Sequence, residues 1–260
     1  NYFSGKIPAT GWSTSLETLN LASNKLTGEV PWSNLGNLKS LNVADNDLEG
    51  MIPDEAFTSF VELCASNNRL EGTIPEVMTG TVLPVSVMDL RGNLLSGTIP
   101  DSYVAAVNCQ SGVFNRFLMS SNNLEGTIPA GFGSHCLDMS LKRLMLDDNL
   151  LTGSVPSLNA LTSLEVLTLQ KNPLTGPLPS MNQMYGLVML GIGLRADVPH
   201  VPYENFPGDA NPRVFILSTD SQDGAFPVDC IAKMSNLFIN TIVTQNFLCM
   251  RVVLCLKYGE

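Results

Sequence analysis

Apolar residues recur along this chain at three fixed positions, which lie eight, five and three residues before a recurring asparagine. Two such sets are Leu16, Leu19 and Leu21 before Asn24, and Leu141, Leu144 and Leu146 before Asn149. The last two positions of each set alternate with polar residues, which is the period-two pattern of a short strand with one buried face. The pattern therefore predicts one short β-strand in every repeat.

Each recurring asparagine opens a second phrase, N-x-L-x-G-x-(I/V)-P, at intervals of roughly 22 to 29 residues. The copies, some of them imperfect, are NYFSGKIP at Asn1, NKLTGEVP at Asn24, NDLEGMIP at Asn46, NRLEGTIP at Asn68, NLLSGTIP at Asn93, NNLEGTIP at Asn122, NLLTGSVP at Asn149 and NPLTGPLP at Asn172. One such coil cannot bury its apolar side alone, so neighbouring coils must stack on a shared core. We expect each asparagine side chain to satisfy backbone groups of its own coil and of the next.

The full phrase L-x-x-L-x-L-x-x-N-x-L-x-G-x-I-P resembles the plant-type leucine-rich-repeat family, and the resemblance covers residues 1–179. It implies an α/β-class horseshoe solenoid of mostly short parallel strands, with one parallel sheet on the concave side. It also implies a second short sheet around the G-x-I-P segments and 3₁₀ or irregular turns on the convex side. Many members are extracellular recognition domains of receptor-like kinases and receptor-like proteins, and similar repeats occur in protist surface proteins.

The repeat register can be followed beyond residue 179, although it degenerates. Arg195 and Asp220 stand where further asparagines are due, and Asn246 is a weaker match. We expect repeats over 1–202, about nine coils with the ninth degenerate, and either degenerate repeats or an irregular cap over 203–260. Neither end carries the cysteine-paired cap that the family often has, so we expect the chain to belong to a longer protein.

Composition and motifs argue against catalysis and against several classes of partner. The net charge of −10 disfavours broad attraction to nucleic acid or anionic membranes. There is no H-E-x-x-H, no G-x-S-x-G, no phosphate-binding loop and no C-x-x-C pair. GIGLRA at 191–196 matches a dinucleotide pattern, but Pro199 follows where a helix would have to continue. We expect no enzyme activity, no cofactor and no metal.

The apolar stretch 237–256 raises the question of a membrane helix. Asn240, Gln245, Asn246 and Arg251 interrupt it. An arginine near the centre of a spanning helix costs about 2.5–3.5 kcal/mol on insertion scales. A degenerate repeat is therefore favoured, and we expect membrane association only through segments outside this chain.

Two cysteines occupy equivalent places in adjacent repeats. Cys109 and Cys136 each stand thirteen residues before a recurring asparagine, which places both on the convex side of stacked coils. Strands stack about 4.8 Å apart and a disulfide joins Cα atoms roughly 5.5 Å apart, so a Cys109–Cys136 bridge is one expectation and two free thiols are the other. A bridge would agree with an extracellular or cell-surface location, whereas the absence of N-x-S/T sequons argues against it.

Side chains between the core positions are expected to point out of the concave sheet and to form columns from coil to coil. Arg116 and Arg143 are predicted neighbours in one column, with Leu118 and Met145 beside them and Arg91 one coil earlier. We interpret this patch as a site for an acidic group, with the two apolar residues as anchors. The alternative is a solvated sheet face on which the arginines pair with Glu62, Asp89 or Asp147.

These observations predict a non-catalytic recognition module that binds a peptide or protein through its concave face, within a receptor-like or cell-surface protein. The alternative function is a structural or adhesive surface protein whose repeats display rather than recognise a single ligand. The candidate ligand-binding residues are Glu62, Asp89, Arg91, Arg116, Leu118, Arg143 and Met145. The predicted structural asparagines are Asn24, Asn46, Asn68, Asn93, Asn122, Asn149 and Asn172.

Overall fold

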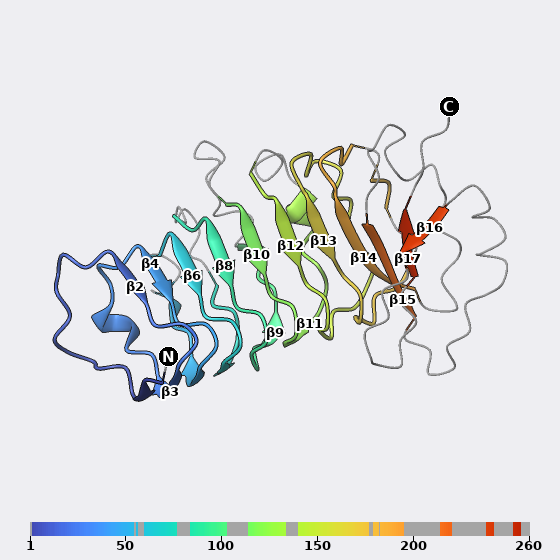
Figure 1. The fold of residues 1–260 in the computed structure, drawn as a ribbon. Coiled ribbons are helices and arrows are strands. Elements are labelled where there is room, and N and C mark those ends of the chain that lie inside the picture. The colour runs from blue at the N-terminus through green and yellow to red at the C-terminus, as the bar shows by residue number, and fades with distance from the viewer. Residues whose placement is uncertain are drawn as a thin grey trace.

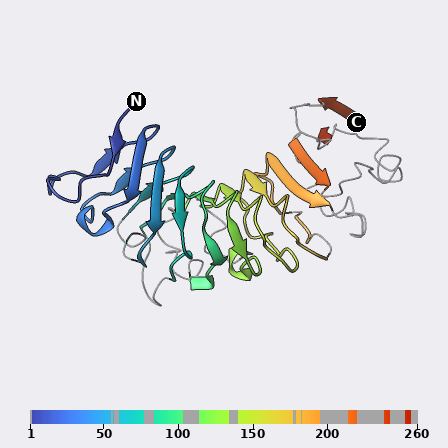
Figure 2. The same ribbon diagram turned by 90° about the horizontal axis from the view of Figure 1, so that it is seen from below.

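The computed structural model is a curved stack of coils, with the strands of successive repeats side by side (Figure 1). It describes residues 2–54, 56, 60–76, 84–102, 114–133, 140–176, 179–181, 183–194, 214–219, 238–241 and 252–255. Figure 2 shows the arc from below. The described part contains almost no helix, and none of its helices is long and apolar enough to cross a membrane.

The larger sheet has eleven strands and contains one short strand from each repeat. Its parallel members, in spatial order, are β2 (Thr18–Asn20), β4 (Ser40–Asn42), β6 (Glu62–Cys64), β8 (Val87–Asp89), β10 (Arg116–Leu118), β12 (Arg143–Met145), β13 (Val166–Thr168), β14 (Met189–Leu194) and β15 (Val214–Thr219). The two remaining strands are antiparallel, β17 (Val252–Cys255) against β15 and β16 (Phe238–Thr241) against β17. The prediction of one strand per repeat is confirmed from β2 to β13.

The G-x-I-P segments form a second, narrower set of parallel strands. These are β1 (Ser4–Gly5), β3 (Lys25–Glu29), β5 (Asp47–Met51) and β7 (Arg69–Glu71) in one sheet, and β9 (Ser96–Thr98) with β11 (Asn123–Glu125) in another. Short 3₁₀ helices, η1 (Trp32–Asn34) and η2 (Ala130–Gly133), lie in the connections. The fold is therefore the leucine-rich-repeat solenoid that the sequence predicts.

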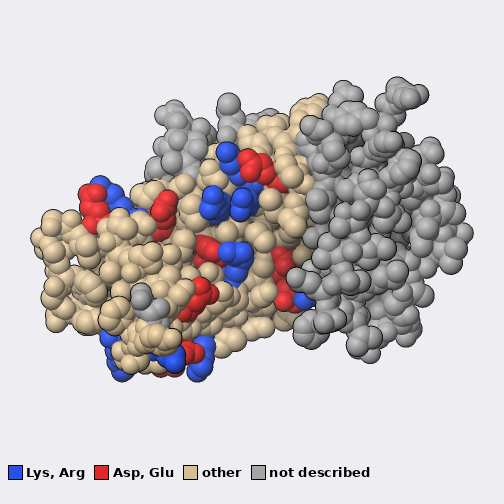
Figure 3. All heavy atoms as spheres, viewed as in Figure 1, with Lys and Arg blue, Asp and Glu red and all other residues tan. Residues whose placement is uncertain are grey.

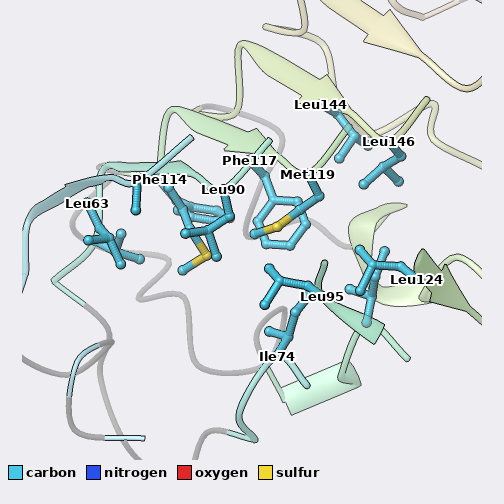
Figure 4. Packing of buried hydrophobic residues seen from close by; sticks show 14 of the residues in the cluster. Leu63, Ile74, Leu90, Leu95, Phe114, Phe117, Met119, Leu124, Leu144 and Leu146 are labelled. Carbon is cyan, nitrogen blue, oxygen red and sulfur yellow. The ribbon is translucent and has the colours of Figure 1, made fainter. Parts of the chain in front are cut away.

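One continuous hydrophobic cluster runs through the stacked coils from Ile7 to Leu190. The central residue of a concave strand points into it, and Leu41 and Leu144 are fully buried there. In the middle of the stack Phe117 packs edge-on against Phe114 and Phe132, with ring centroids 5.8 and 5.5 Å apart (Figure 4 shows Phe114 and Phe117). Because every coil shares this core with its neighbours, the backbone that carries the concave columns is held firmly in place.

The recurring asparagines form an internal hydrogen-bond ladder. Asn68 Nδ2 donates to Ala65 O and Ser66 O in its own coil, at 3.2 Å each, and to Val43 O in the preceding coil at 3.0 Å. Its Oδ1 accepts from the Leu48 amide, also in the preceding coil, at 3.0 Å. The sequence interpretation placed the second set of partners in the next coil, which is wrong because each amide lies between its own turn and the one before it. Bonds of this kind are formed by Asn24, Asn46, Asn93, Asn122, Asn149 and Asn172.

Several expectations concern positions beyond the described residues. Cys109 and Cys136, with their predicted bridge, lie outside them, as do Arg195, Asp220 and Asn246. The boundary at 202/203 also falls outside and stays a prediction. The motif at 191–196 begins inside β14, so its first four residues are part of a strand and not a turn that opens a helix.

Candidate functional site

Arg116 and Arg143 are direct partners across two adjacent parallel strands, β10 and β12. Both side chains are exposed on the concave face. Figure 3 shows basic side chains gathered over this middle part of the sheet. Within the described part of the chain, neither guanidinium forms an ion pair. Two like charges are therefore held side by side with no counter-ion among the described residues.

Arg91, the third predicted arginine, is already engaged. Its Nε and Nη2 donate to Asp89 Oδ1 and Oδ2 at 2.8 and 2.7 Å, which is a bidentate contact. Asp89 is only 8% exposed. The hydrogen bond that Arg91 donates to it raises the pKa of Arg91 above its ordinary value. The two charges neutralise each other, so Asp89 and Arg91 are poor candidates for direct ligand contacts.

The other two acids suggested as partners are bonded to hydroxyl groups. Glu62 Oε2 accepts from Ser40 Oγ at 3.1 Å. Asp147 Oδ1 accepts from Ser120 Oγ and Thr168 Oγ1, at 2.5 Å each. The alternative interpretation was that the arginines pair with nearby acidic residues. Among the described residues, only Arg91 of the three forms such a pair.

The two predicted apolar anchors differ in how much surface they offer. Leu118 is 5% exposed and forms part of the floor of the sheet, whereas Met145 is partly exposed beside it. Leu118 was expected to contact a ligand from its column position, but its side chain is buried. Met145 is the apolar side chain of this pair that a ligand can reach.

A free thiol lies on the same face and was not among the predicted site residues. Cys64, on β6, is partly buried and is the register partner of Asp89 on the adjacent strand β8. Burial raises its pKa, and the charges of Asp89 and Glu62 raise it further, while Arg116 and Arg91 act in the opposite direction. The repeat register was sufficient to predict that Cys64 lies on the concave face. It did not predict the charged residues that surround the thiol. The described residues contain no group of three or more His, Cys, Asp or Glu side chains that could hold a metal ion.

These features define a leucine-rich-repeat solenoid whose concave sheet carries an unpaired arginine couple. The Leucine Rich Repeat family model matches residues 15–35 and 37–58. The chain belongs to the leucine-rich-repeat family, and its repeats are of the plant type. No curated protein matches the sequence.

Solved structures with this fold include plant receptors and one protein of a different kind. The PEPR1–AtPEP1 structure is 32% identical over 74% of this chain and 27% of that chain, with a TM-score of 0.66. The Arabidopsis receptor kinase HAESA, solved with the peptide hormone IDA and the co-receptor SERK1, is 25% identical over 74% and 33%, with a TM-score of 0.62. A plant ice-binding protein is 25% identical over 76% and 64%, with a TM-score of 0.55. The chain thus spans about a third or less of the two receptors.

Proposed function

We propose that the chain is a non-catalytic recognition module that binds an acidic group of a peptide or protein on its concave face. The observation that carries this proposal is the unpaired couple formed by Arg116 and Arg143. A carboxylate placed between two guanidiniums relieves their mutual repulsion and accepts directed hydrogen bonds from both. The solved complex of HAESA with a peptide hormone supports a peptide as the partner.

The energetics of such a contact follow from its exposure. A solvent-exposed ion pair contributes about 0.2–1 kcal/mol, so the couple alone gives preference and orientation but little affinity. Further affinity must come from apolar contact, for which the partly exposed Met145 is available next to Arg143. Charged groups at such a surface mainly accelerate association and exclude wrong partners. The couple acts as the selective element of a larger contact surface.

The similarity to receptor ectodomains also supports an extracellular or cell-surface location within a longer receptor-like protein. On this proposal the described residues position and recognise a ligand and carry out no reaction on it. Any signalling or membrane attachment belongs to other segments of the full protein.

Paired peptide probes test the proposal directly. Immobilised Asp- and Glu-containing peptides are compared with their Asn and Gln counterparts at low ionic strength. Arg116→Glu with Arg143→Glu should abolish the preference for the acidic members. Lys6→Glu with Lys25→Glu is the matched control, because it makes the same change in net charge at exposed residues near the second sheet. Equal preference in the concave variant and the wild type would overturn the proposal.

A second candidate function is binding to ice, and a feature of the second set of strands favours it. Thr73, Thr98 and Thr127 occupy the same position in three successive coils and are exposed. A Cβ built on the glycine of the following coil would lie 2.8–3.0 Å from each methyl group, at Gly97, Gly126 and Gly153. Each threonine methyl group is therefore closely packed against the following coil. The register sets Thr73 opposite Ser96 and Thr98 opposite Glu125, so the threonines repeat with a constant offset of two residues from coil to coil. Such order is needed to distinguish ice from liquid water, because single hydrogen bonds are the same in both.

The similarity to a plant ice-binding protein supports this second candidate. It is a form of the alternative function in which the repeats present a regular surface and do not recognise a single ligand. Inhibition of ice recrystallisation by the purified chain is the test. Thr98→Lys with Thr127→Lys should remove it while keeping the fold, because Lys6 already packs against Gly28 at the equivalent position. A wild-type chain that leaves ice grain growth unchanged excludes this candidate.

A further inference from the structure

The arginine couple belongs to a longer charge pattern along one column of the concave sheet. Glu62, Val87, Arg116 and Arg143 are successive Cα partners on β6, β8, β10 and β12. Their side chains all project from the same face of the sheet. In this order, the charges along the column are negative, neutral, positive and positive. Glu62 is exposed, and no cation of the described residues pairs with it.

The centre of the pattern is neutral because of a specific contact. Asp89 and Arg91 belong to the coil between Glu62 and Arg116, and they cancel each other through the bidentate pair. Without that pair a carboxylate would lie directly between the negative and positive ends. Along this column, the described residues therefore present a carboxylate at Glu62 and, separated from it by a neutral position, two guanidiniums at Arg116 and Arg143.

The distance between these two ends constrains the shape of a partner that contacts both. Adjacent parallel strands lie about 4.8 Å apart, so Glu62 and Arg116 are separated by roughly 10 Å across β8. In a β-strand, side chains on one face repeat at roughly 7 or 13 Å, and neither interval matches. A polyproline II helix has three residues per turn and a rise of about 3.1 Å, so every third side chain shares a face at roughly 9 Å. The polyproline II interval fits the column.

Building on the proposed function, we propose that the concave face binds an extended, polyproline II-type segment with a basic and an acidic residue separated by two others. The basic group lies on Glu62 and the acidic group on Arg116, the arginine of the couple that is nearer to Glu62. The segment crosses the strands along the column and passes over the neutral coil of β8. A segment that is already extended loses little conformational entropy on binding, which suits a shallow sheet face.

Synthetic proline peptides with one lysine and one glutamate test this spacing. The probes carry one, two or three prolines between the two charges, in both chain directions, and binding is measured at low ionic strength. We expect the two-proline peptide, in one direction, to bind about two- to fivefold more tightly than the others, since one exposed ion pair is gained or lost. Glu62→Gln should remove this spacing preference but keep the preference for glutamate over glutamine. Glu125→Gln, an exposed change of the same kind on β11, should alter neither.

The outcomes separate this inference from the proposed function on which it rests. If glutamate is preferred through Arg116 and Arg143 but all three spacings bind equally, the spacing inference is wrong and the proposed function stands. If the one- or three-proline peptide binds best, the polyproline II geometry is wrong. If no probe shows a preference for glutamate over glutamine, the proposed function fails as well.

Discussion

The side-chain oxygen of Asn122 accepts a hydrogen bond from the backbone amide of Leu95, 27 residues earlier and one coil before it, at 3.1 Å. Asn122 Nδ2 donates to Leu90 O and Met119 O, both at 3.0 Å, and the side chain is buried. Removing this amide leaves buried backbone groups of two coils without partners. Asn122→Ala should therefore lower the free energy of unfolding by about 3 kcal/mol.

Chemical denaturation measures this loss, and the adjacent residue provides its control. Asn123 is exposed, so Asn123→Ala should change the stability by less than about 0.5 kcal/mol. Equal effects of the two substitutions would contradict the role assigned to the ladder.

Gly126 directly follows β11 and has a φ of +78°. A Cβ there would lie 2.8 Å from the Thr98 methyl group. Gly126→Ala should destabilise the chain by about 1–2 kcal/mol, because the backbone conformation disfavours any side chain. Gly36→Ala is the control, since nothing lies within 4 Å of a Cβ at that position. A thermal unfolding midpoint that falls as far for the control as for Gly126→Ala would be inconsistent with this account.

Arg91 should influence acid binding without touching the ligand. In Arg91→Ala, the Asp89 carboxylate loses its bidentate partner beside the arginine couple. The preference for a glutamate-containing peptide over its glutamine counterpart should fall about threefold, because the released carboxylate competes with the ligand for the neighbouring arginines. Adding Asp89→Asn should restore the preference, because the released charge is then absent. A double variant as weak as the single one would show that Arg91 contributes in another way.

Cys64 offers a pH-dependent readout of the same surface. Its pKa is raised first by burial and then by Asp89 and Glu62, while Arg116 lowers it. The midpoint of its alkylation rate against pH should lie higher in the folded than in the unfolded chain. Glu62→Gln should lower that midpoint and Arg116→Gln should raise it, as followed by peptide-resolved mass spectrometry. Identical midpoints in both variants would mean that these charges do not act on the thiol.

The same pKa shift fixes the sign of a stability effect. A thiol with a raised pKa in the folded state favours folding at all pH values below its ordinary pKa. This contribution is lost as the pH rises from the ordinary value through the raised one. The stability of the wild type should thus fall more than that of Cys64→Ala on going to alkaline pH.

The strand register and the concave columns could be predicted because the repeat is strictly periodic. Each recurring asparagine sets the phase of its coil, so Arg116 and Arg143 had to face the same way once the coils stacked. The direction of the asparagine bonds was predicted wrongly, since periodicity shows that two coils are joined but not which neighbour supplies the partner. The accessibility of Leu118 also escaped prediction, because it depends on the neighbours that pack around it.

The sequence by itself determined the solenoid, its shared core and the alignment of the columns, because these follow from the spacing of apolar and asparagine positions. Only the tertiary structure decided which charges remain available. Asp89 could have paired with Arg116 or with Arg91, and side-chain geometry within one coil selects Arg91. Periodicity specifies where a side chain starts on the sheet, whereas its partner depends on rotamer and distance, which only the assembled stack defines.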